Sequence, residues 1–258
     1  MLTIDTHAHA WDKSCQLIPN SRYQPDYYFT VETYLQLLAS YHVHKGVLVQ
    51  PSFLGTDNSY LLAALNAHPS HLRGVVVVDK AISFETLFSM HQSGVRGIRY
   101  NLINQPTPLF DDIKFQEMFA YIQTLGWHIE LHAMAFQWPD IVQKLEKTTV
   151  KVVIDHFGRP ENGMVTCKGL EALLASDLDL YVKFSAPYRF TKSSITPLID
   201  LWESRVGKEK MLWGSDAPFT QYEALWHFER SFNVLGARIN EVSFIMQLDA
   251  NAKKLFDF

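Results

Sequence analysis

The feature that most constrains this fold is an alternation, repeated eight times, of short β-rich runs with amphipathic stretches. Runs such as Gly46–Gln50 and Lys151–Asp155 are largely apolar on both faces, which is typical of strands in a parallel sheet covered by helices. The eight expected strands are Leu2–Thr6, Gly46–Gln50, Leu72–Asp79, Val95–Tyr100, Trp127–His132, Lys151–Asp155, Leu180–Ser185 and Lys210–Gly214.

Helices are expected between these strands. Apolar residues recur at helical spacing over Val31–Leu38, with Thr30 as the expected N-cap, and Asp57 is expected to cap the next helix, which carries Leu61–Leu65. The remaining expected helices are Phe84–His91, Lys114–Leu125, Ile141–Glu146, Gly169–Ala175, Ile195–Val206, Tyr222–Phe232 and Glu241–Lys254.

An α/β chain of 258 residues with this alternation predicts a (β/α)8 TIM barrel that forms one domain over residues 1–258. A doubly wound open sheet is the structural alternative. It is disfavoured because no glycine-rich phosphate loop follows the first expected strand.

Composition excludes several classes of partner. The net charge is −4 and no Lys/Arg run occurs, so nucleic-acid binding is not expected. Cys15 and Cys167 have no metal-binding or redox spacing, which indicates a reducing compartment. No signal-like segment or membrane-spanning apolar run is found, so a cytoplasmic protein with no membrane partner is expected, as a monomer or a homodimer.

Polar side chains gather where the expected strands end, which is the functional face of such a barrel. His7 and His9 are two residues apart on one strand, so both imidazoles share a face. They are either metal ligands, acid/base groups, or hydrogen-bonded strand-end residues, and His132 and Asp216 would complete a mononuclear metal site. The polar residues at these ends are His7, His9, Gln50, Ser52, Asp79, Arg99, Asn101, Glu130, His132, Asp155, His156, Lys183, Ser185, Ser215 and Asp216.

Two of these residues have roles that chemistry alone leaves open. Asp216 is either a base that takes a proton from an attacking water or an N-cap after a strand. His156 lies in the stretch "DHFGRP", where Gly158 permits a tight turn, and it either stabilises an oxyanion or forms a structural hydrogen bond. The neighbouring histidine cluster favours the catalytic interpretation of both.

Arginines surround the same face. Arg99, Arg159 and Arg189, together with Arg22-Tyr23 in the long loop after the first strand, predict an anion-binding mouth, although each arginine alone is typical of a surface ion pair. Arg96 falls within a strand and is expected to be structural. The other histidines expected at the surface are His42, His44, His68, His71, His91 and His227.

Six stretches spread over nearly the whole chain carry a family resemblance: "DTHAHAW", "GVLVQPSFLGTDNSYLL", "LRGVVVVD", "GVRGIRYN", "VVIDHFGRP" and "LWGSDAP". They resemble the amidohydrolase superfamily, of the amidohydrolase 2 type, and within it the branch of lactonases that act on 2-pyrone-4,6-dicarboxylate and on sugar lactones. The resemblance implies an amidohydrolase-like barrel and a hydrolase acting on carboxylic ester bonds.

The resemblance also implies residue roles. Asp216 would activate water, and His7, His9 and His156 would polarise the lactone carbonyl. The residues implied to hold the substrate carboxylates and ring are Tyr23, Ser52, Arg99, Arg159 and Arg189.

The resemblance bears on metal content as well. Hydrolysis of the pyrone dicarboxylate in this branch needs no divalent metal, and "GIRYN" lacks the lysine that bridges two metals elsewhere in the superfamily. His132 stands where the pyrone lactonases have tyrosine, so a single zinc ion on a complete ligand set is the alternative to a metal-free site. That set is His7, His9, His132 and Asp216.

The leading hypothesis is therefore hydrolysis of a small anionic lactone by Asp216-activated water. The alternative is a zinc-dependent nonoxidative decarboxylase of an aromatic or unsaturated acid. A third possibility, from another class, is a catalytically silent barrel that binds carboxylates.

Overall fold

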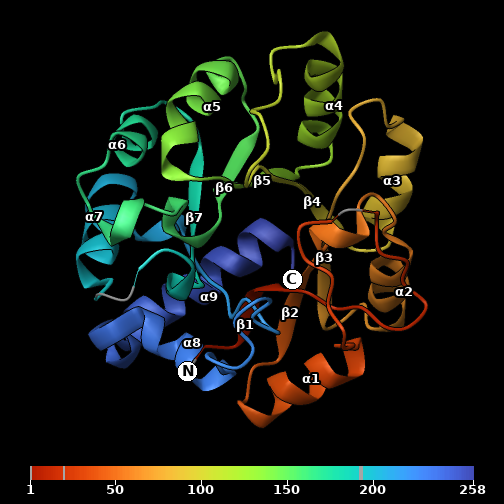
Figure 1. Ribbon diagram of the computed structural model, residues 1–258, viewed down its shortest axis with the longest axis horizontal. Helices are drawn as coiled ribbons and strands as arrows, with labels where there is room; N and C mark the ends of the chain where they lie inside the picture. Colours follow the sequence, from red (N-terminus) through yellow and green to blue (C-terminus); the bar gives the residue numbers. More distant parts are fainter. Residues whose placement is uncertain (1, 20, 192–193) are drawn as a thin grey trace.

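The structure, a computed structural model, describes residues 2–19, 21–191 and 194–258. In this part of the chain eight parallel strands pair in sequence order and helices lie outside them (Figure 1), which confirms the predicted (β/α)8 barrel. The strands are β1 (Ile4–Ala8), β2 (Lys45–Val49), β3 (Leu72–Val76), β4 (Val95–Asn101), β5 (His128–His132), β6 (Lys151–Ile154), β7 (Leu180–Phe184) and β8 (Met211–Trp213).

The helices follow the expected amphipathic stretches. In the first of them Thr30 is the N-cap, as predicted, and its side chain accepts a hydrogen bond from the Thr33 backbone N–H at 3.2 Å. The helices are α1 (Val31–Ser40), α2 (Ser59–Ala67), α3 (Phe84–Gln92), α4 (Ile113–Thr124), α5 (Trp138–Leu145), α6 (Lys168–Leu174), α7 (Thr196–Val206), α8 (Phe228–Phe232) and α9 (Val242–Phe256).

Two helix predictions were wrong in detail. Asn58, not Asp57, occupies the N-cap position of α2, although the Asp57 carboxylate still accepts the Ser59 backbone N–H at 3.1 Å. The helix expected over Tyr222–Phe232 is reduced to α8 at its end, because turns occupy the chain before Phe228 and Gln221 has a left-handed backbone with φ 72°.

Two strands differ from the prediction by more than one residue at a boundary. β1 is shifted towards its carboxyl end, so His7 lies within the strand instead of after it. β3 ends at Val76 because the Asn58 amide takes over the pairing of the next residue: its side chain accepts from the Val77 N–H at 3.1 Å and donates to the Val77 carbonyl at 2.8 Å. Asp79 is consequently an exposed loop residue.

The ring closes between β8 and β1 largely through the residues that follow β8. The Asp216 backbone N–H donates to the His7 carbonyl at 2.8 Å, and the His9 N–H donates to the Ala217 carbonyl at 2.8 Å. The buried Asp5 carboxylate adds bonds from the Ser215 backbone N–H at 2.8 Å and its hydroxyl at 2.6 Å. Closure of the barrel therefore fixes Asp216 directly beside His7.

The end of the barrel away from the carboxyl ends of the strands is closed mainly by apolar side chains. α9 lies across that end, seen through the ring in Figure 1, and its Phe256 is fully buried in a cluster with Val47, Val153 and Leu212. Burial of such side chains stabilises the fold by about 1.5–3 kcal/mol each. The predicted site residues lie towards the other mouth. No helix in the described ranges is long and apolar enough to cross a membrane.

Candidate active site

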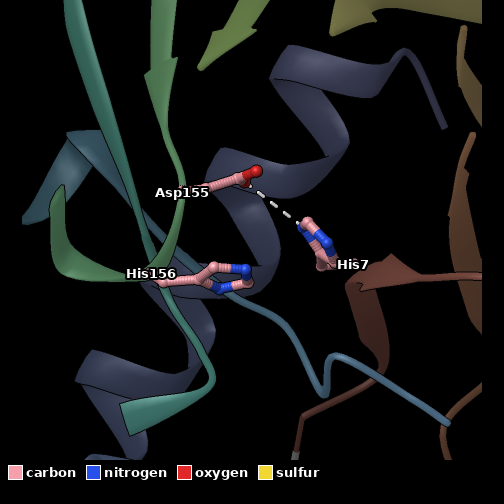
Figure 2. A group of neighbouring side chains, drawn as sticks. All are labelled: His7, Asp155 and His156. Carbon is pink, nitrogen blue, oxygen red and sulfur yellow. Dashed lines mark ion pairs between the residues drawn. The ribbon is translucent and has the colours of Figure 1, made fainter. Parts of the chain in front are cut away.

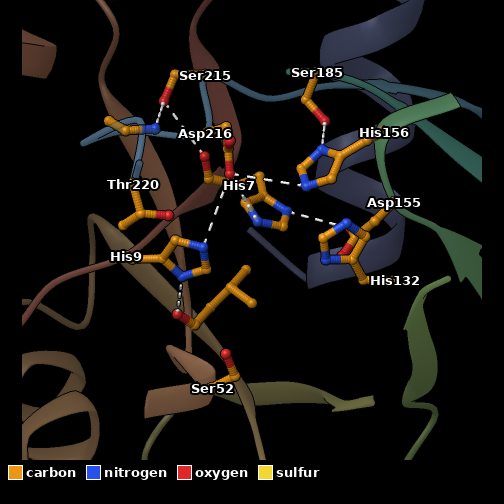
Figure 3. Close-up of polar contacts among 12 residues, drawn as sticks. His7, His9, Ser52, His132, Asp155, His156, Ser185, Ser215, Asp216 and Thr220 are labelled. Carbon is orange, nitrogen blue, oxygen red and sulfur yellow. Dashed lines mark hydrogen bonds and ion pairs between the residues drawn. The ribbon is translucent and has the colours of Figure 1, made fainter. Parts of the chain in front are cut away.

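The carboxyl ends of the strands bring the predicted histidines and Asp216 together (Figure 3). A pocket at this mouth includes every predicted site residue except His7 and Arg159, each of which contacts a lining residue: the His7 Nε2 is 3.6 Å from an Asp216 oxygen, and the Arg159 Nη1 is 3.3 Å from the His132 Nε2. The lining residues are His9, Arg22, Tyr23, Pro51, Ser52, Phe53, Arg99, Asn101, His132, His156, Arg189, Asp216, Thr220 and Gln221.

The pocket adjoins a second cavity of about 320 Å³, with which it shares Arg22, Tyr23 and Ser52. The two spaces together form the candidate substrate site. An apolar cavity of about 370 Å³ on the other side of Tyr188 has no carboxylate or imidazole among the lining residues that the structure describes.

The two oxygens of Asp216 have different surroundings. Oδ2 accepts hydrogen bonds from the Tyr188 hydroxyl at 2.5 Å and from the Arg189 Nε at 2.8 Å. Oδ1 is buried without a hydrogen-bond partner in the described part of the chain. It faces the Nε2 atoms of three imidazoles, those of His7 at 3.6 Å, His9 at 3.8 Å and His156 at 3.9 Å. Oδ2 therefore holds the carboxylate in place, and Oδ1 is free to accept a proton.

The charge of Asp216 is strongly stabilised. Burial alone would raise the pKa of this carboxyl, but the Arg189 guanidinium and the neighbouring imidazoles outweigh burial and hold the pKa well below its ordinary value. Arg189 is affected in the opposite sense: burial acts to lower its pKa, and Asp216 more than compensates. The pair is therefore an ion pair near neutral pH.

The imidazoles are neutral near pH 7. Burial, with Lys183 nearby, lowers the pKa of His7 to about 3, and burial with Arg99 nearby lowers the pKa of His9 to about 4. Burial also places the pKa of His156 well below its ordinary value. The His9 Nδ1 donates to the Val49 carbonyl at 2.7 Å, which leaves a lone pair on Nε2 towards Asp216.

The backbone is strained where it presents these groups. His156, Arg159 and Asp216 have φ angles of 53°, 47° and 65°, in the left-handed region that side chains disfavour. Such residues cost on the order of 1–3 kcal/mol each and cluster at functional sites. Gly158, with φ 77°, lies within the same "DHFGRP" turn, as the sequence predicted.

The arginines divide into paired and unpaired cations. Arg99 is bound to the buried Asp155 carboxylate, with both Nε and Nη2 3.0 Å from Oδ2, and Arg189 is bound to Asp216. No carboxylate in the described ranges pairs with Arg159, whose Nη2 donates to the Arg189 carbonyl at 2.9 Å, or with the exposed Arg22. The positive charge available to a ligand therefore comes chiefly from Arg159 and Arg22.

His132 lies between two of these cations. Its Nδ1 is 3.3 Å from the Arg99 Nη2, and its Nε2 is 3.3 Å from the Arg159 Nη1. Both ring nitrogens thus face guanidinium groups, a position that suits a hydrogen-bond acceptor more than a ligand of a cation.

One group of side chains has the ligand atoms and the spacing that suit a divalent metal ion. His7, His9 and Asp216 place ligand atoms within 4.8 Å of one another, and the unpartnered His7 Nε2 and Asp216 Oδ1 are among them. A second group with the same spacing joins His7, Asp155 and His156 (Figure 2). Imidazole with carboxylate is a zinc-type ligand set, so His7, His9 and Asp216 fit one such ion, whereas His132 belongs to neither group.

Sequence reasoning did not identify several contacts that support the site. Lys183 and Glu130 form a fully buried ion pair beneath His7, and Tyr188 binds Asp216. The hydroxyls of Tyr23 and Tyr27 both donate to Glu223, at 2.5 Å and 2.8 Å. The sequence placed Lys183 and Glu130 at the strand ends but did not show that they pair with each other, and the Glu223 contacts join segments some 200 positions apart and left no local signal.

A parallel eight-stranded barrel whose mouth joins a carboxylate to a histidine cluster is a barrel of the hydrolase type. The chain belongs to the amidohydrolase family, whose model matches residues 4–257.

Curated relatives narrow the comparison. The chain is 26% identical over 236 residues to 4-sulfomuconolactone hydrolase of Rhizobium radiobacter, covering 84% of this chain and 76% of that protein. It is 26% identical over 195 residues to 2-pyrone-4,6-dicarboxylate hydrolase of Comamonas testosteroni, covering 75% of this chain and 61% of that protein. These relatives are hydrolases that act on the ester bond of a lactone.

Solved structures agree in fold. A protein of Acinetobacter baumannii, provisionally assigned as a 2-pyrone-4,6-dicarboxylic acid hydrolase and crystallised with citric acid bound, is 30% identical with a TM-score of 0.92, and the match covers 100% of both chains. An amidohydrolase of Burkholderia multivorans with bound zinc is 16% identical with a TM-score of 0.79 over 100% of both chains, a likeness that shows the fold alone.

Proposed function

We propose that this protein hydrolyses a small lactone that carries at least one anionic substituent. The observation that carries the proposal is the free Oδ1 of Asp216, which faces three imidazole Nε2 atoms at 3.6–3.9 Å in a pocket that also holds unpaired guanidinium charge. The lactone hydrolases among the relatives, and the citrate bound to the Acinetobacter protein, support an anionic ligand.

In the proposed reaction Asp216 acts as the base and two histidines stabilise the oxyanion. Asp216 Oδ1 takes a proton from water as the water oxygen bonds to the lactone carbonyl carbon, and the carbonyl π electrons move onto oxygen. Hydrogen bonds donated by His7 and His156 stabilise this oxyanion, whereas His9, whose Nε2 carries a lone pair, accepts a hydrogen bond from the attacking water. The intermediate then collapses, the ring C–O bond breaks, and the protonated Asp216 returns its proton to the leaving oxygen.

A base must have a pKa near the working pH, and Asp216 alone does not, because Arg189 holds its pKa low. A substrate carboxylate bound against Arg189 and Arg159 would offset the guanidinium charge and raise the pKa of Asp216. The anionic group of the substrate thereby activates the base as well as securing the ligand.

The other predicted binding residues surround the adjoining cavity. Ser52 accepts a hydrogen bond from the Asn101 amide at 3.2 Å, and Tyr23 is held by Glu223. In the proposal these side chains contact the lactone ring, while Arg99, paired with Asp155, contributes the rigid wall between the pocket and the cavity. In the tautomer in which the His7 Nε2 carries a lone pair, His7, His9 and Asp216 would hold a single zinc ion, which would supply Lewis-acid polarisation of the carbonyl.

The test is Asp216→Asn, assayed on 2-pyrone-4,6-dicarboxylate, 4-sulfomuconolactone and a neutral δ-lactone. The amide keeps the shape but cannot take a proton, so turnover should fall by about 100-fold or more while the circular dichroism spectrum is unchanged. Asp79→Asn, a change at an exposed loop carboxylate beyond the end of β3, is the matched control and should behave as wild type. Unimpaired turnover in Asp216→Asn, or no ring opening of any lactone by the wild-type protein, would reject the proposal.

A further inference from the structure

A cluster of four charged side chains is sealed beneath the active site. Lys183 on β7 forms an ion pair with Glu130 on β5, and Arg99 on β4 binds Asp155 after β6. Glu130, Asp155 and Lys183 are 0% exposed and Arg99 is 3% exposed. The two pairs are joined because the Arg99 Nε lies 3.5 Å from the Glu130 Oε1. Burial and the neighbouring Asp155 raise the pKa of Glu130 to about 8, although Lys183 and Arg99 act to lower it.

Such a cluster is not explained by stability. Burying charges costs several kcal/mol per ion, and replacing buried ion pairs with apolar residues of similar volume is often neutral or stabilising. The apolar Phe256 ring lies just below, 6.0 Å from the Lys183 Nζ, so the fold could have continued its apolar core through this layer. On its other side the cluster contacts the His7 imidazole.

The contact with His7 is specific to one ring nitrogen. The Lys183 Nζ lies 3.2 Å from the His7 Nδ1 with hydrogen-bond geometry. The Asp155 Oδ1 and Glu130 Oε1 are also near, 3.3 Å and 3.5 Å from the same nitrogen, but neither contact has the geometry of a hydrogen bond. An ammonium group only donates hydrogen bonds, so Nδ1 is the acceptor and the proton of the neutral ring lies on Nε2.

We infer that Lys183 is a positioning residue that holds His7 as the Nε2–H tautomer, and so makes it an oxyanion donor instead of a metal ligand. This inference rests on the proposed function for the identity of the oxyanion. The Nε2–H points to the free Oδ1 of Asp216, where the attacked carbonyl would lie. His9 has the opposite tautomer, because the Val49 carbonyl holds its proton on Nδ1 and leaves the lone pair on Nε2.

Without the ammonium group the opposite tautomer of His7 becomes favourable. The Asp155 Oδ1, at 3.3 Å, would then accept a proton carried by Nδ1, and the Nε2 lone pair would face Asp216. In that form His7, His9 and Asp216 present two imidazole lone pairs and a carboxylate to the same point, which is the form that binds zinc.

Two variants separate positioning from charge balance. Lys183→Met leaves Glu130 unpaired, whereas the double variant Lys183→Met with Glu130→Gln removes one charge of each sign from the cluster. Long-range ¹H–¹⁵N spectra of the imidazoles, with His7→Gln to assign the signal, report the tautomer. We expect Nε2–H in wild type and Nδ1–H in both variants. A wild-type His7 protonated on Nδ1 would overturn the inference, even if neither variant folds.

Kinetics and zinc binding give independent readouts. Loss of one oxyanion donor is expected to lower kcat by about 100-fold in both variants with KM little changed, and calorimetry with zinc chloride should show tighter binding than wild type. Recovery of wild-type kcat in the double variant would mean that Lys183 only balances Glu130, and would refute positioning. If no lactone is hydrolysed by wild type, the proposed function fails, but the tautomer and zinc measurements still decide the role of Lys183.

Discussion

The active-site geometry predicts that Arg189→Met changes the pH dependence of turnover. The Arg189 Nη2 lies 2.7 Å from the Asp216 Oδ2, and the arginine side chain is only 7% exposed. Two unit charges about 4 Å apart at an effective dielectric constant of about 20 attract by ~4 kcal/mol. Since one pKa unit corresponds to about 1.4 kcal/mol, removing the guanidinium should raise the pKa of Asp216 by about 3 units.

The sign of the effect on activity follows from the proposed base role of Asp216. In the free wild-type enzyme the pKa of Asp216 is far below its ordinary value, so its protonation does not limit kcat/KM at acidic pH. In Arg189→Met the guanidinium no longer opposes the effect of burial, and kcat/KM should fall as the pH decreases through the raised pKa. The assay is kcat/KM for an anionic lactone from the lowest pH at which the protein stays folded, about pH 3, to about pH 9, with an acidic limb at higher pH in the variant than in wild type.

Arg159→Met is the matched control, because Arg159 also faces the ligand but forms no hydrogen bond with Asp216. It should raise KM and leave the acidic limb where wild type has it. If Arg189→Met shows the same acidic profile as wild type, or if Arg159→Met shifts the limb equally, the coupling of Arg189 to Asp216 does not control the base and the reasoning fails.

Three further predictions follow from particular contacts. Glu223→Ala removes the acceptor shared by Tyr23 and Tyr27, loosens the loop after β1, and should raise KM more than it lowers kcat in steady-state assays. In Gly169→Ala the new Cβ would lie 1.7 Å from the Ala135 carbonyl oxygen, so urea denaturation should show a loss of about 3 kcal/mol or more, or no folded protein. A neutral lactone matched in ring size to an anionic one should be slower in kcat as well as weaker in KM, and equal kcat values would contradict activation of the base by the substrate anion.

Most of the fold could be predicted because its signal is periodic. The strands are apolar on both faces and alternate with stretches such as Val31–Leu38, a pattern that only a covered parallel sheet explains. The errors arose where side chains override the pattern. The Asn58 amide replaces a strand neighbour beyond Val76, and left-handed residues such as Gln221 stop the chain from starting a helix before Phe228.

The candidate site was predictable in its membership but not in its pairing. The i, i+2 spacing of His7 and His9 and the carboxyl-end rule gather the histidines and Asp216 at one mouth, and the structure places them there. No local pattern tells which arginine is neutralised by which carboxylate, because Arg99 with Asp155 joins β4 to the end of β6. Whether a metal occupies the site remains a prediction, and it depends on proton positions that only contacts such as that of Lys183 determine.

The pairing of two arginines with buried carboxylates explains the expected preference for anionic substrates. Arg99 and Arg189 are each neutralised by a buried carboxylate, so they add rigidity but little net attraction. A neutral lactone would meet an Asp216 whose pKa is held low, and the base would stay weak. An anionic lactone adds a negative charge beside Arg189, shares its guanidinium with Asp216, and raises the proton affinity of Oδ1 at the moment when water must be deprotonated. In the proposed mechanism, substrate charge and base strength are therefore coupled through one guanidinium, and selection for anionic substrates would take place in the chemical step as well as in binding.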